Sequence, residues 1–233
     1  MLFRSSKNSP KPVLYFTYFD WLSTQEDSLE YVKVHCTPDT DEGYAFDIGL
    51  EHHLGNTTNS GTWARPKYNS TFTFLRLGID GNIRFFTYYD KVDWGAWEVT
   101  YILFDRNWSE SECQLPERCG EFGLCDNNQC VACPMSNGLL GWSKDCKPKK
   151  ITSCGMNDFH YYKVEGADHF MSKFTTGNTL TENNCGKKCS EDCKCLGYFY
   201  HKETSKCWVA YDLNTLTKSS NSTHVGYIKV PNH

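Results

Sequence analysis

The sequence predicts a mostly β, disulfide-rich protein built from several domains. Twelve of the thirteen cysteines lie between residues 113 and 207, whereas the first 112 residues contain only Cys36. Paired cysteines at this density stabilise small secreted domains that have little core of their own. The cysteine-poor part carries short aromatic and β-branched runs without a helical period, which indicates strands. This uneven distribution over 233 residues favours three domains.

Residues 1–112 predict an all-β domain. Residues 1–12 form either a polar lead-in or the interior of a domain that starts earlier. The clearest signal is a hairpin, in which Asp80-Gly81-Asn82 joins residues 72–79 to residues 83–89, because an Asp-Gly pair supplies the positive φ of a tight turn. The other predicted strands of this half cover residues 13–19, 31–35, 44–49 and 94–104.

Two tryptophans, Trp94 and Trp97, open the last of these strands. Exposed aromatic rings stack on sugars, but Trp and Phe lie far more often inside the core of a β-sheet protein. We therefore expect both side chains in the core and assign neither to a binding site.

The twelve clustered cysteines predict two disulfide frameworks. The first group has an even number of cysteines, so all of them can pair within the group. Several pairings are possible, and the sequence does not decide between them. Five cysteines lie between residues 185 and 207, so one of them must pair outside, and Cys154 is nearest. Zinc is the rival interpretation, but only Cys130 and Cys133 have Cys-x2-Cys spacing. The two groups are Cys113, Cys119, Cys125, Cys130, Cys133 and Cys146, and Cys154, Cys185, Cys189, Cys193, Cys195 and Cys207.

Residues 147–150 form a short basic linker, and the last domain begins near residue 151. Within it, residues 181–190 predict a short helix with Thr181 or Asn183 as its N-cap. Cys185 and Cys189 are four residues apart and so lie on one face of that helix. Bridges from this face can staple the helix to a sheet, whose predicted strands cover residues 195–200, 207–211 and 225–230.

Four Asn-x-Ser/Thr sequons beside the cysteines indicate N-glycosylation in the secretory pathway. They lie at Asn56, Asn69, Asn107 and Asn221. The opening residues lack the apolar region of a signal peptide, and no apolar run is long enough for a membrane span. We therefore expect an N-terminally truncated form or a fragment of an exported protein. The net charge of −4 gives no signature of nucleic-acid binding.

The sequence contains no common catalytic motif, since the serine-hydrolase, zinc-protease, P-loop and dinucleotide-binding patterns are all absent. We therefore predict no enzyme, no cofactor and no metal ion. His52 and His53 fit an exposed polar loop better than a metal site, and residues 39–43 fit a solvated acidic turn better than a calcium loop.

The order of these parts resembles a plant family. A β-rich half, the Cys113–Cys146 module and a helix-stapled cysteine domain are similar to the S-locus glycoprotein, EGF-like and PAN/apple segments of bulb-type lectin receptor ectodomains. Residues 75–84 look like the Leu-x-Leu-Asp-x-Asp-Gly-Asn-Leu hairpin of that family. Residues 7–15 and 138–146 are most similar to the epidermis-specific secreted glycoproteins of plants, which lack the kinase.

The resemblance implies three domains. Residues 1–112 correspond to a second bulb-lectin-like domain of β-prism fold, residues 113–146 to an EGF-like module, and residues 151–233 to a PAN/apple domain with a helix on an antiparallel sheet. Cys36 stays unmatched and is either free and buried or paired beyond this chain. The implied disulfides are Cys113–Cys125, Cys119–Cys130, Cys133–Cys146, Cys185–Cys207, Cys189–Cys195 and Cys154–Cys193.

The resemblance also implies a secreted, non-enzymatic glycoprotein of the apoplast or cell wall with a carbohydrate-binding architecture. The mannose motif of bulb lectins has no match in residues 1–112, so no mannose-binding residue is carried over. The alternative is a module for protein-protein interaction or self-association that acts through the EGF-like and PAN domains. The expected partner is therefore a cell-wall carbohydrate or an extracellular protein.

Overall fold

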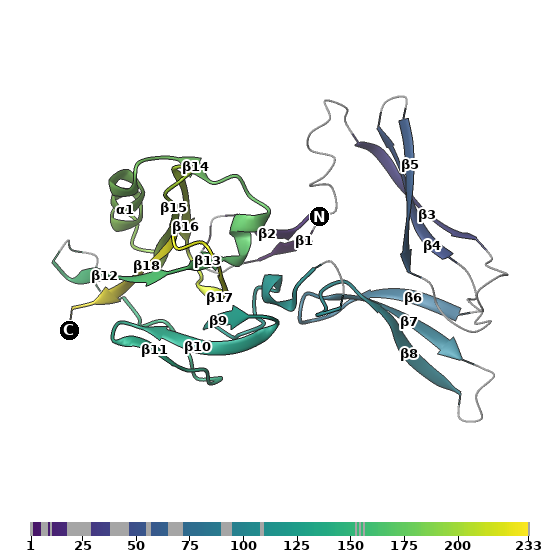
Figure 1. Ribbon diagram of the computed structural model, residues 1–233, viewed down its shortest axis with the longest axis horizontal. Coiled ribbons are helices and arrows are strands. Elements are labelled where there is room, and N and C mark those ends of the chain that lie inside the picture. The colour runs from purple at the N-terminus through teal and green to yellow at the C-terminus, as the bar shows by residue number, and fades with distance from the viewer. Residues whose placement is uncertain are drawn as a thin grey trace. The chain divides into compact units, whose positions relative to one another are not determined.

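The computed structural model divides the chain into two compact units (Figure 1). Unit 1 combines residues 1–18 with residues 110–233, and unit 2 is residues 19–109. The predicted mostly β, disulfide-rich and multi-domain fold class is confirmed. The structure describes residues 2–5, 9, 11–17, 29–37, 47–54, 57–64, 72–89, 95–107, 110–151, 153, 155 and 157–232.

Unit 2 contains two three-stranded antiparallel sheets whose strands follow chain order, as in successive hairpins. The predicted strands at residues 31–35, 72–79, 83–89 and 94–104 correspond to β3, β6, β7 and β8. The backbone of His52 and His53 lies in β4, so the predicted loop at these residues is wrong. The strands are β3 (Leu29–Thr37), β4 (Asp47–Leu54), β5 (Thr57–Ala64), β6 (Phe72–Leu77), β7 (Ile83–Tyr89) and β8 (Ala96–Ile102).

The predicted hairpin between β6 and β7 is confirmed. Gly81 has φ of 81°, and its amide donates a hydrogen bond of 3.0 Å to the Gly78 carbonyl. The buried Asn82 side chain then binds the backbone of Phe104 twice. Its Nδ2 donates to the Phe104 oxygen at 2.9 Å, and its Oδ1 accepts from the Phe104 amide at 3.0 Å. The turn is thereby tied to the segment that follows β8.

Unit 1 contains two five-stranded sheets and a separate β1–β2 hairpin. The first sheet has the order β11-β10-β9-β17-β13 and the second the order β12-β18-β15-β16-β14. The strands are β1 (Leu2–Arg4), β2 (Val13–Phe16), β9 (Phe122–Asp126), β10 (Gln129–Met135), β11 (Gly138–Gly141), β12 (Phe159–Glu165), β13 (Ala167–His169), β14 (Asn178–Thr179), β15 (Gly197–His201), β16 (Lys206–Ala210), β17 (Asn214–Lys218) and β18 (His224–Pro231). The helices are η1 (Glu112–Gln114), η2 (Phe170–Lys173) and α1 (Glu182–Ser190).

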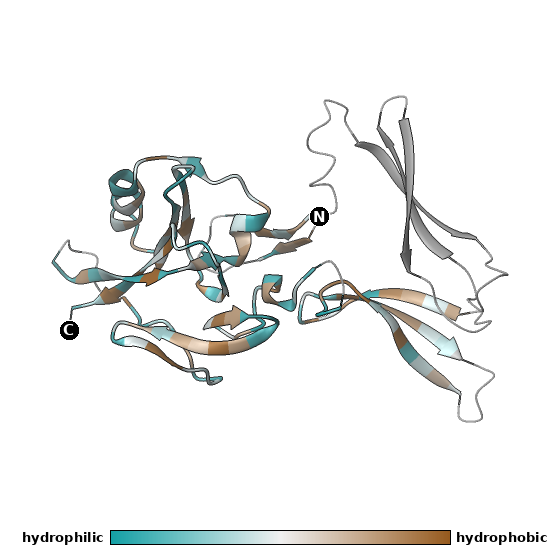
Figure 2. Ribbon diagram, viewed as in Figure 1, coloured by the Kyte–Doolittle hydropathy of each residue, from teal (hydrophilic) through white to brown (hydrophobic). Residues whose placement is uncertain are grey.

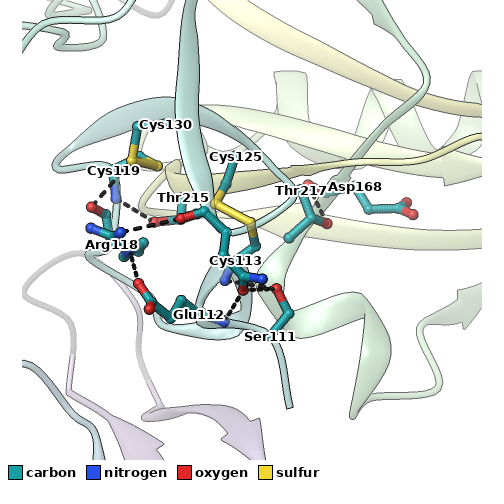
Figure 3. Close-up of a disulfide and its surroundings, with 11 residues drawn as sticks. Ser111, Glu112, Cys113, Arg118, Cys119, Cys125, Cys130, Asp168, Thr215 and Thr217 are labelled. Atoms are coloured by element: carbon teal, nitrogen blue, oxygen red, sulfur yellow. Dashed lines mark hydrogen bonds and ion pairs between the residues drawn. A yellow bond between two sulfur atoms is a disulfide. The ribbon is translucent and has the colours of Figure 1, made fainter. Parts of the chain in front are cut away.

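A parallel pairing between β9 and β17 joins the Cys113–Cys146 module to the last part of the chain. The Cys119 amide donates to the Thr215 hydroxyl at 3.0 Å (Figure 3). The Thr215 amide donates to the Pro116 carbonyl at 2.8 Å. The two segments therefore share one sheet, although the predicted linker at residues 147–150 separates them in sequence. The three-domain division itself stays a prediction.

The predicted helix at residues 181–190 is confirmed as α1. The Thr181 hydroxyl accepts a hydrogen bond of 3.3 Å from the Asn184 amide and so caps its N-terminus. Cys185 and Cys189 are fully buried on the face that meets β15 and β16. Their bridges to Cys207 and Cys195 staple the helix to the sheet.

Five disulfides join described residues, and all five are pairs that the family resemblance implies. Cys193 is also bridged, whereas Cys154 and the side chain of Cys36 lie outside the described residues. The five pairs are Cys113–Cys125, Cys119–Cys130, Cys133–Cys146, Cys185–Cys207 and Cys189–Cys195.

Apolar residues occupy many positions in the strands of unit 1. Figure 2 shows them in brown along β9 and β10. Phe122, Phe199 and Leu216 are among its fully buried side chains. Burial of each such side chain stabilises the fold by about 1.5–3 kcal/mol. This core therefore adds to the stability that the disulfides give unit 1. Within the described part of the chain, no helix has the length and apolar character needed to span a membrane.

Candidate ligand-binding surfaces

One face of the β6–β7–β8 sheet consists mainly of aromatic side chains, and we call it the aromatic face. Alternate residues of a strand point to the same side of a sheet, and the pairing register aligns them across the three strands. Phe74 lies opposite Phe86, and Tyr88 lies opposite Trp97. The aromatic face is formed by Phe72, Phe74, Phe86, Tyr88, Trp97 and Val99.

The rings of the aromatic face contact one another and remain open to solvent. The Phe74 ring stacks on Phe86 with centroids 5.1 Å apart and meets Trp97 edge-on at 4.9 Å. The exposed fractions are 44% for Phe74 and 51% for Trp97. Figure 2 shows apolar colouring on β6 and β8. Trp97 was expected in the core, and its exposure contradicts that expectation; Trp94 lies outside the described residues.

The opposite face of the same sheet contains buried residues. Phe85 and Tyr101 pack edge-on with centroids 5.7 Å apart, and both are buried. Beside them, the hydroxyls of Thr73, Thr87 and Thr100 form a chain of hydrogen bonds of 3.1 and 2.9 Å. An antiparallel sheet usually turns its polar face to water, so an exposed aromatic face is the less expected arrangement.

Arginine side chains extend the aromatic face towards the hairpin turn. Arg76 and Arg84 are cross-strand partners, two residues along from Phe74 and Phe86. Arg84 forms an ion pair with Asp80, and this hydrogen bond holds the pKa of the Asp80 carboxyl below its usual value. The face therefore combines flat apolar rings with guanidinium donors, a combination suited to sugars.

Unit 1 contains a pocket of about 270 Å³ beside the β1–β2 hairpin. Arg4 and Lys11 lie at this pocket, and Phe170 and Met171 supply apolar lining. His169 also lines it, but its ring is bonded on both sides: Nε2 donates to the Asp212 carbonyl at 2.9 Å, and Nδ1 accepts from the Met171 amide. Burial lowers the pKa of His169 to about 4, which leaves the ring neutral. This histidine therefore has a structural role.

Two of the predicted N-glycosylation sites lie among the described residues. Asn107 is exposed in the turn after β8. Asn221 is half-buried before β18, where its Oδ1 accepts from the Thr223 amide at 2.9 Å and its Nδ2 donates to Glu203 at 3.2 Å. Asn56, Asn69 and residues 39–43 lie outside the described residues. Glycosylation at all four sequons stays a prediction.

The sequence contains a periodic signal for the aromatic face. The Phe72-x-Phe74 and Phe86-x-Tyr88 repeats place aromatic rings on one side of each strand. Periodicity alone does not say whether that side faces a core or solvent. Exposure therefore had to come from the structure.

Comparison with known proteins places the chain among plant glycoproteins. It is 43% identical over 236 residues to EP1-like glycoprotein 3 of Arabidopsis thaliana, which covers 100% of this chain and 53% of that protein. It is 44% identical over 182 residues to the epidermis-specific secreted glycoprotein EP1 of Daucus carota, covering 71% of this chain and 46% of the relative. A G-type lectin S-receptor-like serine/threonine-protein kinase of Arabidopsis thaliana is 31% identical over 136 residues, or 51% of this chain and 16% of the kinase.

The chain thus spans about half the length of the curated glycoproteins it matches. No protein-family model matches it, and no solved structure is similar to it. The identity to EP1-like glycoprotein 3 extends along the whole chain, and the description of the relatives as glycoproteins agrees with the sequons. The chain belongs to the EP1-like family of secreted plant glycoproteins.

Proposed function

We propose that this chain is a non-enzymatic, N-glycosylated protein of the plant apoplast or cell wall that binds carbohydrate through the aromatic face. Residues 1–112 then act as a bulb-lectin-like domain, and the EGF-like and PAN domains at residues 113–146 and 151–233 support it. The observation that carries the proposal is the exposed group of Phe74, Trp97 and their neighbours.

Aromatic rings bind sugars because the apolar C–H face of a pyranose packs flat on a π-system. The aromatic face exposes several rings, with Phe72, Phe74 and Trp97 exposed by 59%, 44% and 51%, so more than one sugar can contact it. Arg76, exposed on the same face, supplies donors for sugar hydroxyls. This geometry favours a polysaccharide chain over a single enclosed sugar, because the surface is open. The lectin-type receptor kinase among the relatives supports the same class of ligand.

The first test is a cell-wall glycan array probed with the secreted chain after its disulfides have been mapped. We expect binding to polysaccharide, and we expect Trp97→Ala and Phe74→Ala each to weaken it by about 5-fold, since loss of one stacking ring costs about 1 kcal/mol. Leu75→Ala is the matched control, because Leu75 is 47% exposed on the same strand but points to the other face. Equal binding by all three variants would remove the proposal.

A second candidate function is protein-protein interaction through unit 1. Leu139 and Leu140 on β11 are 60% and 50% exposed, and β11 is an edge strand of its sheet. Exposed adjacent leucines favour an apolar contact with another protein. If the chain self-associates in light scattering and Leu139→Ser with Leu140→Ser abolishes this, the second function gains support. A monomer at all concentrations argues against self-association.

A further inference from the structure

Three side chains of unit 1 that lie far apart in sequence come together at one end of the β15–β18 pair. Asp168 belongs to β13, His201 is the last residue of β15, and His224 is the first residue of β18. His201 and His224 are direct cross-strand partners. The His224 carbonyl accepts a hydrogen bond of 2.9 Å from the Gly166 amide, so the Asp168 segment is held against this pair.

Both imidazole rings direct one nitrogen at the same carboxylate. His201 Nε2 lies 2.6 Å from Asp168 Oδ1, and His224 Nδ1 lies 2.7 Å from Asp168 Oδ2. The two rings stack with centroids 3.5 Å apart and an interplanar angle of 8°. The side chains are 14%, 14% and 21% exposed for Asp168, His201 and His224, so solvent reaches the group.

The backbone and neighbouring rings keep this geometry in place. The Lys202 amide donates to the Thr223 carbonyl at 3.1 Å, which closes the ladder one residue beyond the histidines. The Trp208 ring packs against His201 with centroids 4.4 Å apart, and Ser219 Oγ lies 3.3 Å from His224 Nδ1. Each ring is therefore oriented before any ligand arrives, which reduces the entropic cost of binding.

The donor set matches a divalent transition-metal ion. Two imidazole nitrogens and one carboxylate oxygen are common zinc ligands, and three protein ligands leave a fourth position for water. The three donor atoms lie within 4.8 Å of one another. Tetrahedral zinc needs roughly 3.3 Å between donors, so small side-chain rotations suffice. In the described part of the chain, one other cluster of potential ligands exists, at Cys119, Cys125 and Cys130, but its sulfurs form disulfides.

We propose that Asp168, His201 and His224 form a binding site for one divalent transition-metal ion, with Zn²⁺ as the probe. On binding, the ion takes the place of the proton that each imidazole shares with Asp168, and that proton is released to solvent or moves to the other ring nitrogen. Each bound ring then carries its one proton on the nitrogen that faces away from Asp168. His201 then binds the ion through Nε2, His224 through Nδ1 and Asp168 through one oxygen. The fourth position stays open to water or to an oxygen atom of an extracellular ligand.

The test is calorimetric titration of the full chain with Zn²⁺, using a Cys36→Ser background so that no thiol at that position competes. We expect one equivalent to bind. Asp168→Asn and His224→Gln each remove a direct ligand, so each should weaken binding by more than the roughly 10–100-fold loss typical of an outer-shell partner. His160→Gln is the matched control, because His160 is exposed on β12 and bonds to Asn232. Its affinity should equal that of the background chain.

A second measurement uses the background chain alone, so it does not require the ligand variants to fold. In ¹⁵N spectra of the imidazole rings, Zn²⁺ should shift the resonances of His201 Nε2 and His224 Nδ1 and leave those of His160 in place. The absence of Zn²⁺ binding by the background chain would overturn the proposal. Binding that leaves both ring resonances unmoved, or that both ligand variants retain in full, would overturn it as well.

Discussion

His169 illustrates at the scale of one residue how burial sets a protonation state. Its ring is 2% exposed, and burial lowers its pKa from 6.5 to about 4 despite the hydrogen bond to the Asp212 carbonyl. The unfolded chain therefore takes up this proton first as the pH falls. The stability contributed by the neutral ring is complete above pH 6.5 and is lost between about pH 6.5 and 4.

We predict that the free energy of unfolding decreases by about 3 kcal/mol over this range because of His169 alone. The measurement is denaturant unfolding at several pH values for the parent chain and for His169→Gln, which has no group that titrates there. The variant should have a flatter dependence on pH. Parallel curves for the two proteins would show that another group causes the loss.

The exposure of two side chains could not be predicted from the sequence. Trp97 begins an apolar strand and was expected in the core, yet it is 51% exposed. Lys229 carries a charge in the predicted strand at residues 225–230, yet it is 1% exposed, and its Nζ lies 3.3 Å from the Cys189 and Asp192 carbonyls. For both residues the side-chain type and the periodicity are known from the sequence, but whether another part of the chain covers the side chain depends on distant segments.

At the scale of the element, local signals predicted structure well. The Asp80-Gly81 turn and the capped helix α1 depend on residues within one turn of each other, and both predictions are confirmed. The parallel β9–β17 pair and the Asp168, His201 and His224 cluster depend on segments tens of residues apart, and no local pattern marks them. Disulfides also join residues that are distant in sequence. The even or odd number of cysteines in each group reduced the number of possible pairings, and the family resemblance implied the pairs themselves.

The two bridges of α1 differ in the loop that each closes, which allows a prediction. Cys185–Cys207 has a sequence separation of 22 residues and Cys189–Cys195 one of 6. The chain-entropy relation gives about 3.4 kcal/mol for the longer loop and about 2.2 kcal/mol for the shorter. Replacing the first pair by alanine should therefore destabilise unit 1 more than replacing the second.

Denaturant unfolding of the two double-alanine variants checks this order, with Thr181→Ala as a variant that weakens only the cap of the helix. Thr181→Ala should lower the free energy of unfolding by about 1 kcal/mol. Because Cys185, Cys189, Cys195 and Cys207 are all fully buried, the cavities left by the two double variants are similar and do not decide the order. Equal losses, or a larger loss for the short loop, would contradict the entropic explanation.

At the scale of the whole molecule, residues 113–146 and residues 157–232 of unit 1 are held together by a sheet that contains strands of both. None of the five described disulfides connects residues 113–146 to residues 157–232. The connection includes the β9–β17 ladder, the Cys119–Thr215 hydrogen bond and the Lys218–Asp126 ion pair of 2.8 Å. The Tyr162 hydroxyl also donates a hydrogen bond of 2.9 Å to the Pro134 carbonyl. Two segments with separate disulfide frameworks thereby share one sheet, which favours cooperative unfolding.

The basic segment at residues 147–150 connects the two regions covalently, and its Lys149 and Lys150 are exposed. We predict that cutting the chain there, at a single engineered protease site, leaves the two fragments associated, because the β9–β17 pairing and its buried contacts persist without the connection. After cleavage, both fragments should elute together in size-exclusion chromatography under native conditions and separate in denaturant without reductant. Thr215→Val removes the hydroxyl that accepts from the Cys119 amide and should promote separation. If the cut fragments of the parent chain separate in native buffer, the shared sheet contributes less than the covalent connection, and the two regions behave as independent domains.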